Sequence, residues 1–572
     1  MSQEKTIKKI LQEITKINEI KFETPKDPQF GDIAFPCFSL SKDRKQSPII
    51  IAKELEEEFK KNNKDETIIV EAKGPYLNFK IDDKELNSKL IEEIITKEKI
   101  IKPEKKKEKV LIESPGPNTN KPLHLGHLRN ILLGKTIYKL LELNGKDTHM
   151  VNVINDRGIH ICKSMLAYQK WGENKTPEES GMKGDHFVGH WYVKFSQEAS
   201  KDEKRKKELE EEAQEMLIRW EEGDETVLKL WNKMNKWVYE GFEETYKELN
   251  FKIEKNYYES ATYKGGKEII EEGVKKKIFY KDETGATIVD LENKKLGKKV
   301  LLRSDNTSVY ITQDINMANL RYKDYKFNEM IYIVGNEQEY HFKVLFEIFK
   351  LLEWPFANNC KHYSYGMIEL PEGKMKSREG NVIDTDDLLK NMKQLSEEEI
   401  KKRYPQLEKN EIKKRADMIA KGAIYFFFLK QDPVRNFVFD PKKSLSFEGE
   451  TGPYVQYTHA RICSIIRKSE IETKKDNFES LTLLTNNEEK QLIKELKQFK
   501  EIIAEAGNRL KPSLITNYLL TLSQSFNNYY SKHRVIQENK KLEEARILLL
   551  KAVKKTIKEG LEILDIKAPE KM

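Results

Sequence analysis

Two histidines and a glycine, His124, Gly126 and His127, have residue types and a spacing that could bind a phosphate. They follow a β-like run at 110–114 and precede an amphipathic helical pattern at 128–143. A turn between a strand and a helix can hold an anion, because free backbone amides point outward there and glycine lets a ligand approach. We therefore expect both imidazoles to donate hydrogen bonds to nucleotide phosphates; capping or core histidines are the alternative.

A second basic segment lies far downstream and could act on the same phosphates. It follows a turn at 371–373, precedes Gly380 and consists of Lys374, Met375, Lys376, Ser377 and Arg378. Three cationic side chains on a glycine-flanked segment can close over a triphosphate and the leaving pyrophosphate. The alternative is an exposed basic turn in a lysine-rich chain.

The elements that must position these residues alternate between strands and helices. This alternation predicts a parallel, Rossmann-like sheet with crossover helices in a catalytic domain at 109–385. A charged helical segment at about 173–265 and a hairpin-like segment at about 285–300 are interpreted as insertions that split it. The expected strands are 110–114, 148–154, 331–334 and 362–365, and the expected helices are 128–143, 159–171 and 338–352.

The remaining chain makes this a multidomain α/β protein. Residues 1–108 show helical stripes and short strand patterns, which predict a small α+β N-terminal domain that ends in a lysine-rich linker. Residues 386–449 are predicted to form a helical stem. Residues 450–572 are almost wholly helical in pattern, which predicts a separate all-α C-terminal domain.

The composition restricts the class of protein further. Among 572 residues, 35% are charged and the mean hydropathy is −0.73. No run approaches the roughly 18 apolar residues of a membrane span. The four cysteines form no C-x-x-C pair, so we expect no structural zinc, no disulfide framework and a reducing cytoplasm. The net charge of +8 suits a polyanionic partner, although a lysine-rich surface that only confers solubility explains it equally well.

The sequences at 124–127 and 374–378 resemble the two signature motifs of class I aminoacyl-tRNA synthetases. Longer stretches resemble the arginyl-tRNA synthetase family in particular. They follow one another in the expected order, at 31–34, 114–129, 309–314, 335–341, 451–461 and 566–572. The resemblance implies a ligase that joins arginine to tRNA(Arg) with ATP, and a C-terminal domain that binds the anticodon.

The resemblance also implies roles for the phosphate-binding residues. The catalytic residues would be His124, His127, Lys121 and Lys374, and those that bind ATP would be His124, Gly126, His127, Met375, Lys376 and Ser377. Position 377 departs from the family pattern, which usually has a lysine there. The resemblance suggests Lys121 as the substitute, because one ammonium group can reach the α-phosphate from either side of a site. A surface lysine is the alternative.

Selection of arginine requires acceptors arranged for a planar guanidinium. Tyr310 and Asp314 share one face if their segment is helical, and Glu113 ends the first strand of the sheet. By resemblance, Asp314 and Glu113 bind the guanidinium beside Tyr310, while Asn118 and Gln338 line the amino-acid pocket. Taken singly, each would more often be an ordinary core or surface residue. A site of paired polar contacts rejects other amino acids, so no editing domain is expected.

The implied partners are L-arginine, tRNA(Arg) and ATP, which is a substrate, with Mg²⁺ expected on its phosphates. No membrane contact is expected, and a monomer is expected by analogy. Aromatic residues mixed with bases suit stacking on unpaired RNA bases, although about half of them should be core residues. The candidates for RNA contact are Tyr454, Tyr457, His459, Arg461, Tyr529, Tyr530, His533 and Arg534, and in the N-terminal domain Phe35 and Phe38.

Three other functions agree with parts of the pattern. A small-molecule nucleotidyltransferase is disfavoured by the long helical C-terminal region. A class I synthetase for lysine, glutamate or cysteine is disfavoured by the acidic residues expected around the side chain and by the lack of cysteine pairs. A non-catalytic RNA-binding relative is disfavoured by the intact signature residues.

Overall fold

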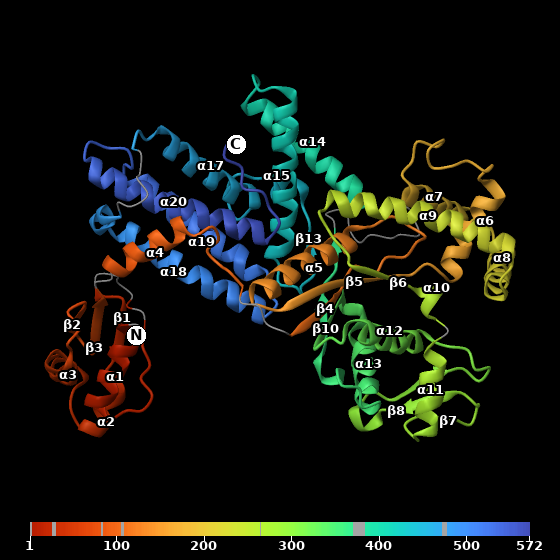
Figure 1. The fold of residues 1–572 in the computed structure, drawn as a ribbon, viewed down its shortest axis with the longest axis horizontal. Coiled ribbons are helices and arrows are strands. Elements are labelled where there is room, and N and C mark those ends of the chain that lie inside the picture. The colour runs from red at the N-terminus through yellow and green to blue at the C-terminus, as the bar shows by residue number, and fades with distance from the viewer. Residues whose placement is uncertain are drawn as a thin grey trace. The chain divides into compact units, whose positions relative to one another are not determined.

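The computed structural model describes residues 3–23, 25, 30–81, 84–103, 108–263, 265–369, 384–471 and 478–572. They form two compact units (Figure 1). The first comprises 1–98, 465–497 and 525–555, and the second 99–464, 498–524 and 556–572. Four long helices contribute residues to both units, so the C-terminal region is not one separate contact unit: α17 (Gly452–Lys468), α18 (Asn487–Asn508), α19 (Ser513–Lys532) and α20 (Lys540–Ile563).

The N-terminal part of the first unit has the predicted α+β fold. An antiparallel sheet of order β1-β3-β2 packs against α1 and α3, because Ile7 and Leu11 on α1 and Leu55 and Phe59 on α3 face its apolar side. The elements are α1 (Gln3–Thr15), β1 (Ile33–Pro36), α2 (Phe38–Arg44), α3 (Pro48–Asn62), β2 (Ile68–Lys73), β3 (Tyr76–Ile81) and α4 (Lys84–Thr96).

The second unit is built on a five-stranded parallel sheet of order β11-β10-β4-β5-β6, which confirms the predicted Rossmann-like core. Its strands are β4 (Lys109–Glu113), β5 (Asp147–Ile154), β6 (Lys255–Tyr258), β10 (Glu329–Gly335) and β11 (Cys360–Tyr365). Strand β6 differs from the prediction, which placed 173–265 in an insertion. Only Tyr257 of this edge strand is buried, so it lacks the apolar run of the other strands.

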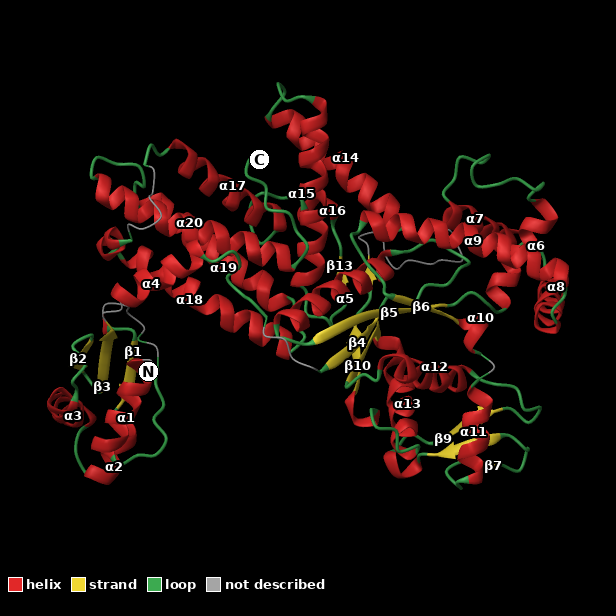
Figure 2. Ribbon diagram, viewed as in Figure 1, coloured by secondary structure: helices red, strands yellow, loops and turns green. Residues whose placement is uncertain are grey.

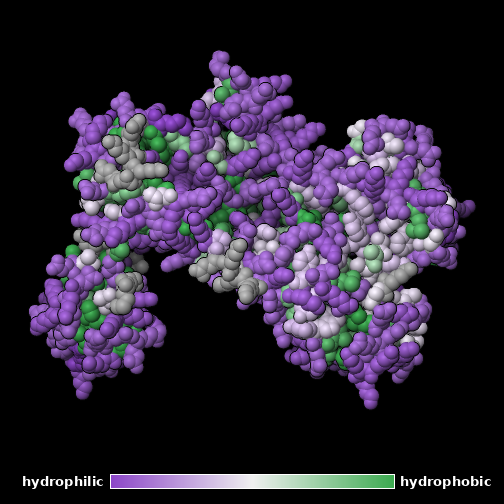
Figure 3. Space-filling view, viewed as in Figure 1, coloured by the Kyte–Doolittle hydropathy of each residue, from purple (hydrophilic) through white to green (hydrophobic). Residues whose placement is uncertain are grey.

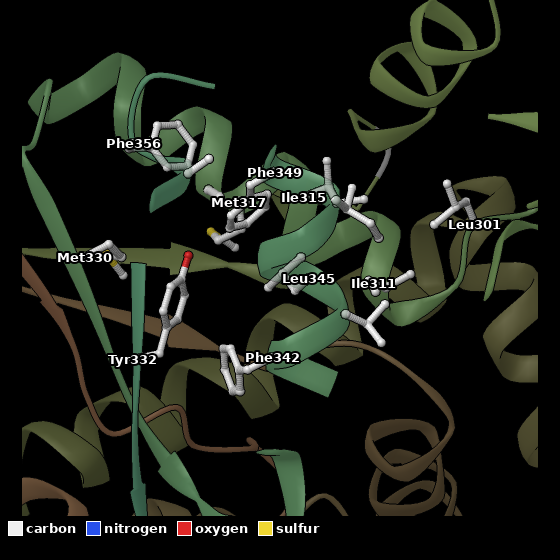
Figure 4. Packing of buried hydrophobic residues seen from close by; sticks show 14 of the residues in the cluster. Leu301, Ile311, Ile315, Met317, Met330, Tyr332, Phe342, Leu345, Phe349 and Phe356 are labelled. Carbon is white, nitrogen blue, oxygen red and sulfur yellow. The ribbon is translucent and has the colours of Figure 1, made fainter. Parts of the chain in front are cut away.

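Both faces of the sheet are covered by helices. Helix α5 (Leu125–Leu143) joins β4 to β5 on one face, and α12 (Tyr310–Tyr325) and α13 (Glu339–Leu351) cover the other (Figure 2). Leu111 belongs to the core beneath α12 and α13, part of which Figure 4 shows around Tyr332 and Phe342. Side chains alternate along a strand, so Glu113 points to the same face as Leu111.

Helices dominate the segment between β5 and β6, as the sequence predicted, and a three-stranded antiparallel sheet follows it. The elements are α6 (Ile159–Trp171), α7 (Gly184–Ala199), α8 (Glu203–Glu222), α9 (Glu225–Glu248), α10 (Glu259–Thr262), α11 (Gly266–Lys275), β7 (Tyr280–Lys281), β8 (Thr287–Asp290) and β9 (Lys298–Leu302). Strands β8 and β9 lie where the sequence indicated a hairpin.

A helical hairpin follows the last strand of the core. It consists of α14 (Thr385–Arg403) and α15 (Lys409–Lys430), and the short α16 (Pro441–Ser444) comes after it. Two short strands, β12 (Ile368–Glu369) and β13 (Phe437–Val438), pair in parallel. Segment 498–524 also belongs to this unit: Leu510 accepts a hydrogen bond from the Tyr363 hydroxyl at 2.7 Å.

The surface reflects the high proportion of charged residues. Figure 3 shows a mostly hydrophilic face with scattered apolar side chains. Within the described ranges, every helix is too short or too polar to cross a membrane.

Candidate active site

The strand order places a candidate site at the carboxyl ends of β4 and β10. Chain connections leave β4 toward β5 and leave β10 toward β11, in opposite directions, and ligands of open parallel sheets bind at such a switch point. Glu113 ends β4, and Gln338 follows the end of β10. Asn130 of α5 holds these strands together: it accepts from the Ser114 hydroxyl at 2.6 Å and donates to the Ile333 carbonyl at 2.6 Å.

The two signature histidines form the N-terminus of α5. His124 is the capping residue, and its Nδ1 accepts from the Gly126 amide at 3.1 Å. The His127 Nδ1 accepts from the His124 amide, also at 3.1 Å, and the two ring centroids are 3.9 Å apart. A Cβ at position 126 would lie 2.9 Å from the His124 ring, so any other residue there would have to displace the imidazole. Because each Nδ1 accepts, each Nε2 carries the proton and can donate to a ligand.

Both histidines are neutral in this environment. Burial, with the nearby Lys121 charge as the second cause, lowers the pKa of His124 to about 3. Burial also holds the pKa of His127 well below its usual range, and the His124 and Lys121 charges add to that shift. The pair therefore presents neutral N–H donors at any pH at which a nucleotide is fully ionised.

Lys121 is a half-buried cation beside this pair. Burial lowers the pKa of its ammonium group. Among the described residues, no carboxylate or other acceptor pairs with its Nζ. An ammonium group that is partly removed from water and lacks a counter-ion favours binding of an anion.

The second basic segment, with Lys374, Met375, Lys376 and Ser377, lies outside the described residues. The first described residues after it belong to the N-terminus of α14, which contacts the histidine turn: the Thr385 amide donates to the Leu123 carbonyl at 2.8 Å, and Asp384 forms a β-bridge with His124. On its other side, β12 lies close to α5, because the Arg129 guanidinium donates to the carbonyls of Gly366 and, at 2.9 Å, of Pro433.

A buried ion cluster fixes the first turn of α14 to helices α7 and α9. The Lys183 ammonium donates to Asp386 at 2.5 Å and to Thr245 of α9 at 2.5 Å, and contacts Asp185 at 3.3 Å. His186 lies 3.0 Å from Asp386. Although burial alone would raise it, these hydrogen bonds hold the pKa of Asp386 at about 2. Asp185, His186 and Asp386 are close enough to share a metal ion, but the Lys183 ammonium already lies against both carboxylates and offsets part of their charge.

The expected guanidinium acceptors lie together on the α12 face of the sheet. Burial raises the pKa of the Glu113 carboxyl; the nearby Arg321 opposes this shift and the Asp314 charge adds to it. Glu113 forms an ion pair with Arg321, and Asp314 lies 2.7 Å from Nε2 of His341 on α13. Glu259 contributes a third carboxyl: burial raises its pKa to about 7, with Asp314 among the contributing charges. This end of the site is acidic, whereas the histidine end is basic or neutral.

The other predicted pocket residues are exposed at this edge of the sheet. Tyr310 begins α12 and is 80% exposed, one helical turn before Asp314, as the spacing predicted. Asn118 lies in the loop after β4, beside Asn155 at the end of β5. Gln338 is the residue before α13. Their exposure leaves these side chains accessible to a substrate.

Comparison with known proteins identifies the family to which the chain belongs. The model of the family "tRNA synthetases class I (R), catalytic domain" matches residues 89–441. The chain belongs to the arginyl-tRNA synthetase family. The arginyl tRNA synthetase N terminal domain matches residues 2–81, and the DALR anticodon binding domain matches residues 455–572.

Arginyl-tRNA synthetase relatives match over almost the full chain. The arginine–tRNA ligase of Treponema denticola is 44% identical over 568 residues, which cover 97% of this chain and 95% of the relative. That of Borrelia hermsii is 42% identical over 581 residues, which cover 99% and 98%. The solved arginyl-tRNA synthetase of Thermus thermophilus has a TM-score of 0.80 at 25% identity and covers 100% of this chain and 99% of its own.

The candidate RNA contacts of this arginyl-tRNA synthetase family member divide into exposed and buried residues. Arg461 lies 4.8 Å over the half-exposed Tyr457 ring on α17, and Tyr454 is half-exposed on the same helix. Phe38, Tyr530 and Arg534 are exposed, and His533 is held by Glu488 at 3.0 Å. Three candidates prove to be core residues, which excludes direct contact with RNA in this conformation: His459, Tyr529 and Phe35. His459 instead lies 2.8 Å from the Pro569 carbonyl.

Several residues that shape the site were missed by the sequence analysis. Lys183, Arg321 and Asn130 read as ordinary charged or polar residues, because the partners that tie them to the site lie far away along the chain: Asp386 for Lys183, Glu113 for Arg321 and Ile333 for Asn130. One signal was available for Arg321: it lies seven residues after Asp314, so two helical turns bring both side chains to one face.

Proposed function

We propose that the chain is an arginine–tRNA ligase. It activates L-arginine with ATP to arginyl-adenylate and pyrophosphate, and then transfers arginine to the 3′-terminal adenosine of tRNA(Arg). The observation that carries this proposal is the opposite polarity of the two ends of the site. Lys121 and two neutral imidazoles face one end, whereas Glu113, Asp314 and Glu259 make the other end acidic. A pair of substrates with anionic phosphates and a cationic side chain fits this arrangement.

In the first step the arginine carboxylate attacks the α-phosphorus of ATP and pyrophosphate leaves. Negative charge shifts onto the phosphate oxygens in the transition state. The Nε2–H groups of His124 and His127 donate hydrogen bonds to these oxygens, and the Lys121 ammonium supplies a full positive charge. Lys374 and Lys376 act from the second signature motif, together with Met375 and Ser377, which contact the nucleotide. The enzyme forms no covalent intermediate, so catalysis rests on positioning and on charge.

Mg²⁺ accompanies ATP. The carboxylate cluster around Asp386 already contains the Lys183 ammonium, and the histidine turn carries no carboxylate among its described residues. The ion would bind through the ATP phosphates and water, as Mg²⁺ commonly does, and would supply further positive charge to the phosphates.

Asp314 and Glu113 bind the guanidinium of the substrate, with Tyr310 beside it, and Asn118 and Gln338 hold its α-amino and carboxylate end. A lysine ammonium would leave part of this fork unpaired, and buried acceptors without donors cost free energy. Glutamate would be repelled by the acidic end. The site therefore selects arginine without an editing step.

The second step takes place on bound tRNA. The adenylate passes arginine to the 2′-hydroxyl of the terminal adenosine, and efficient adenylate formation requires the tRNA. Tyr454, Tyr457 and Arg461 on α17 contact the RNA, while Phe38 offers an exposed ring in the N-terminal domain. The enzyme acts in the cytoplasm as a monomer.

The decisive experiment is ATP–pyrophosphate exchange with each of the twenty amino acids, with and without tRNA(Arg). We expect exchange with arginine alone and a strong dependence on tRNA. Exchange with lysine or glutamate, or the absence of exchange under every condition, would contradict the proposal. Aminoacylation of tRNA(Arg) with labelled arginine checks the second step separately.

A further inference from the structure

Arg321 is a buried arginine with a single anionic partner. It lies on α12 with 1% of its surface exposed, and its Nη1 forms the ion pair with Glu113. Its Nε and Nη2 have no hydrogen-bond partner among the described residues. Its guanidinium lies 5.3 Å from the ring centre of Tyr257 and 5.9 Å from that of Tyr332. Glu113 is therefore the one group that compensates this buried charge, apart from the two ring faces.

The same carboxylate belongs to the arginine end of the active site. Asp314 and Arg321 are seven residues apart on α12, so both face the carboxyl end of β4, where Glu113 lies. We propose that Arg321 is a positioning residue for substrate specificity: it keeps Glu113 ionised and occupies one edge of the Glu113 carboxylate, so that the other edge is presented to the substrate guanidinium. This inference rests on the proposed function.

The charges around Glu113 show why such a group is needed. Glu113 is buried, and the charge of the neighbouring Asp314 adds to the effect of burial in raising the pKa of the Glu113 carboxyl. The groups that face Glu113 are Arg321 and Asp314 from α12 and Tyr332 from the adjacent β10. Arg321 is the one cation among them. Without it, burial and the Asp314 charge would both favour the protonated, neutral form of Glu113.

The protonation state of Glu113 decides which side chain it can accept. An ionised carboxylate accepts N–H bonds from a guanidinium, whereas a neutral carboxyl group also donates a hydrogen bond. A neutral Glu113 could therefore bind the ureido oxygen of citrulline, the uncharged analogue of arginine. Arg321 thus strengthens discrimination between a cationic guanidinium and its neutral analogue, although it does not contact the substrate.

The test compares the wild type with Arg321→Met in tRNA-dependent, arginine-driven pyrophosphate exchange between pH 6 and pH 9. In the variant, the KM for arginine should rise about tenfold or more at low pH. A tenfold rise corresponds to an increase of about one unit in the pKa of the Glu113 carboxyl. The increase should shrink as the pH rises, because a higher pH favours the ionised form of Glu113. Inhibition by citrulline should become stronger relative to binding of arginine. A loss of activity of equal size at every pH would overturn the inference.

Two further variants separate this role from a purely structural one. Arg321→Lys retains the charge, so its pH profile should stay close to that of the wild type; a profile shifted toward high pH would overturn the inference even if Arg321→Met does not fold. In the Glu113→Gln/Arg321→Met double variant nothing titrates at position 113, so the pH dependence of the KM should disappear. Its persistence would show that another group is responsible.

Arg546→Met is a matched control. Arg546 is also buried and pairs with one carboxylate, Glu489, at 2.9 Å, in the first unit. Its loss should lower the thermal midpoint without shifting the pH profile of the arginine KM. The same pH shift in both variants would overturn the role assigned to Arg321. If the wild type shows no arginine-driven exchange, the proposed function itself fails.

Discussion

Lys121 is the residue on which the proposed charge balance of the ATP end depends. It is half-buried, unpaired among the described residues and close enough to lower the pKa of both histidines. The lysine usual at position 377 is a serine here. A cation at Lys121 is placed to supply this charge from the opposite motif, at the N-terminus of α5.

Replacement of Lys121 by alanine tests this substitution of charge. The rate of arginine-dependent pyrophosphate exchange should fall by about 10²-fold or more, because one charge contact to the transition state is lost. The Kd for tRNA, measured by filter binding, should change less than about threefold, since Lys121 is not among the residues proposed to contact the RNA. An unchanged exchange rate in Lys121→Ala, together with a strongly reduced rate in Lys374→Ala, would show that the second motif does not depend on the Lys121 charge.

The sequence could predict the phosphate end of the site better than the acidic end. His124, Gly126 and His127 are contiguous, so their contacts follow from the local turn. The proximity of Glu113 to Asp314 could not be predicted from a local pattern, because it depends on the packing of α12 across β4. Arg321 was missed because a lone arginine in a helical stripe is normally a surface residue, although its seven-residue spacing from Asp314 places both on one face of the helix.

At the scale of elements, the first turn of α14 connects the helical insertion to the ATP end of the site. Asp386 receives hydrogen bonds from Lys183 at 2.5 Å and from Thr245 at 3.0 Å, and the preceding Thr385 contacts the Leu123 carbonyl. A change in this cluster should therefore alter the position of the histidine turn, and it should affect the arginine pocket much less.

Asp386→Asn tests this connection. The free energy of unfolding should fall by about 1–3 kcal/mol, because Lys183 loses a charged partner. The KM for ATP should rise several-fold, whereas the KM for arginine should stay nearly constant. The control is Glu399→Gln on the same helix, which removes a solvent-exposed pair with Lys402 and should alter neither constant. An equal rise of both KM values in Asp386→Asn would contradict the assignment to the ATP end.

Element boundaries followed closely from periodicity where burial was strong. The predicted bounds of α6 agree with the structure, and α5 begins three residues earlier than predicted, at Leu125, because the capping histidine extends it. Strand β6 was missed because only one of its residues is fully buried, and β1 because it has only four residues. The periodic spacing of apolar residues reflects burial, so elements with few buried side chains cannot be predicted from it.

At the scale of the whole molecule, the excess of positive charge suits the proposed binding of a polyanionic RNA. The net charge is +8, although 103 basic residues are nearly balanced by 95 acidic ones. Binding of tRNA through lysine and arginine releases counterions from the phosphates, whereas binding of arginine inside the site does not.

The two substrates should therefore respond differently to salt. Between about 50 and about 200 mM KCl, the KM for tRNA(Arg) in aminoacylation should rise at least about tenfold, with a linear relation between its logarithm and that of the salt concentration. The KM for arginine should change much less over the same range. A tRNA constant that is insensitive to salt would contradict an interface built on phosphate contacts.

The position of β4 in the middle of the parallel sheet has a consequence for synthesis of the chain. One neighbour, β5, follows after one helix, but the other, β10, is encoded roughly 200 residues after β4. At a translation rate of about 5–20 residues per second, the ribosome needs about 10–40 s to supply it. During that interval the backbone N–H and C=O groups on that edge of β4 have no native partner, so this nascent chain should depend on chaperones more than its finished fold suggests.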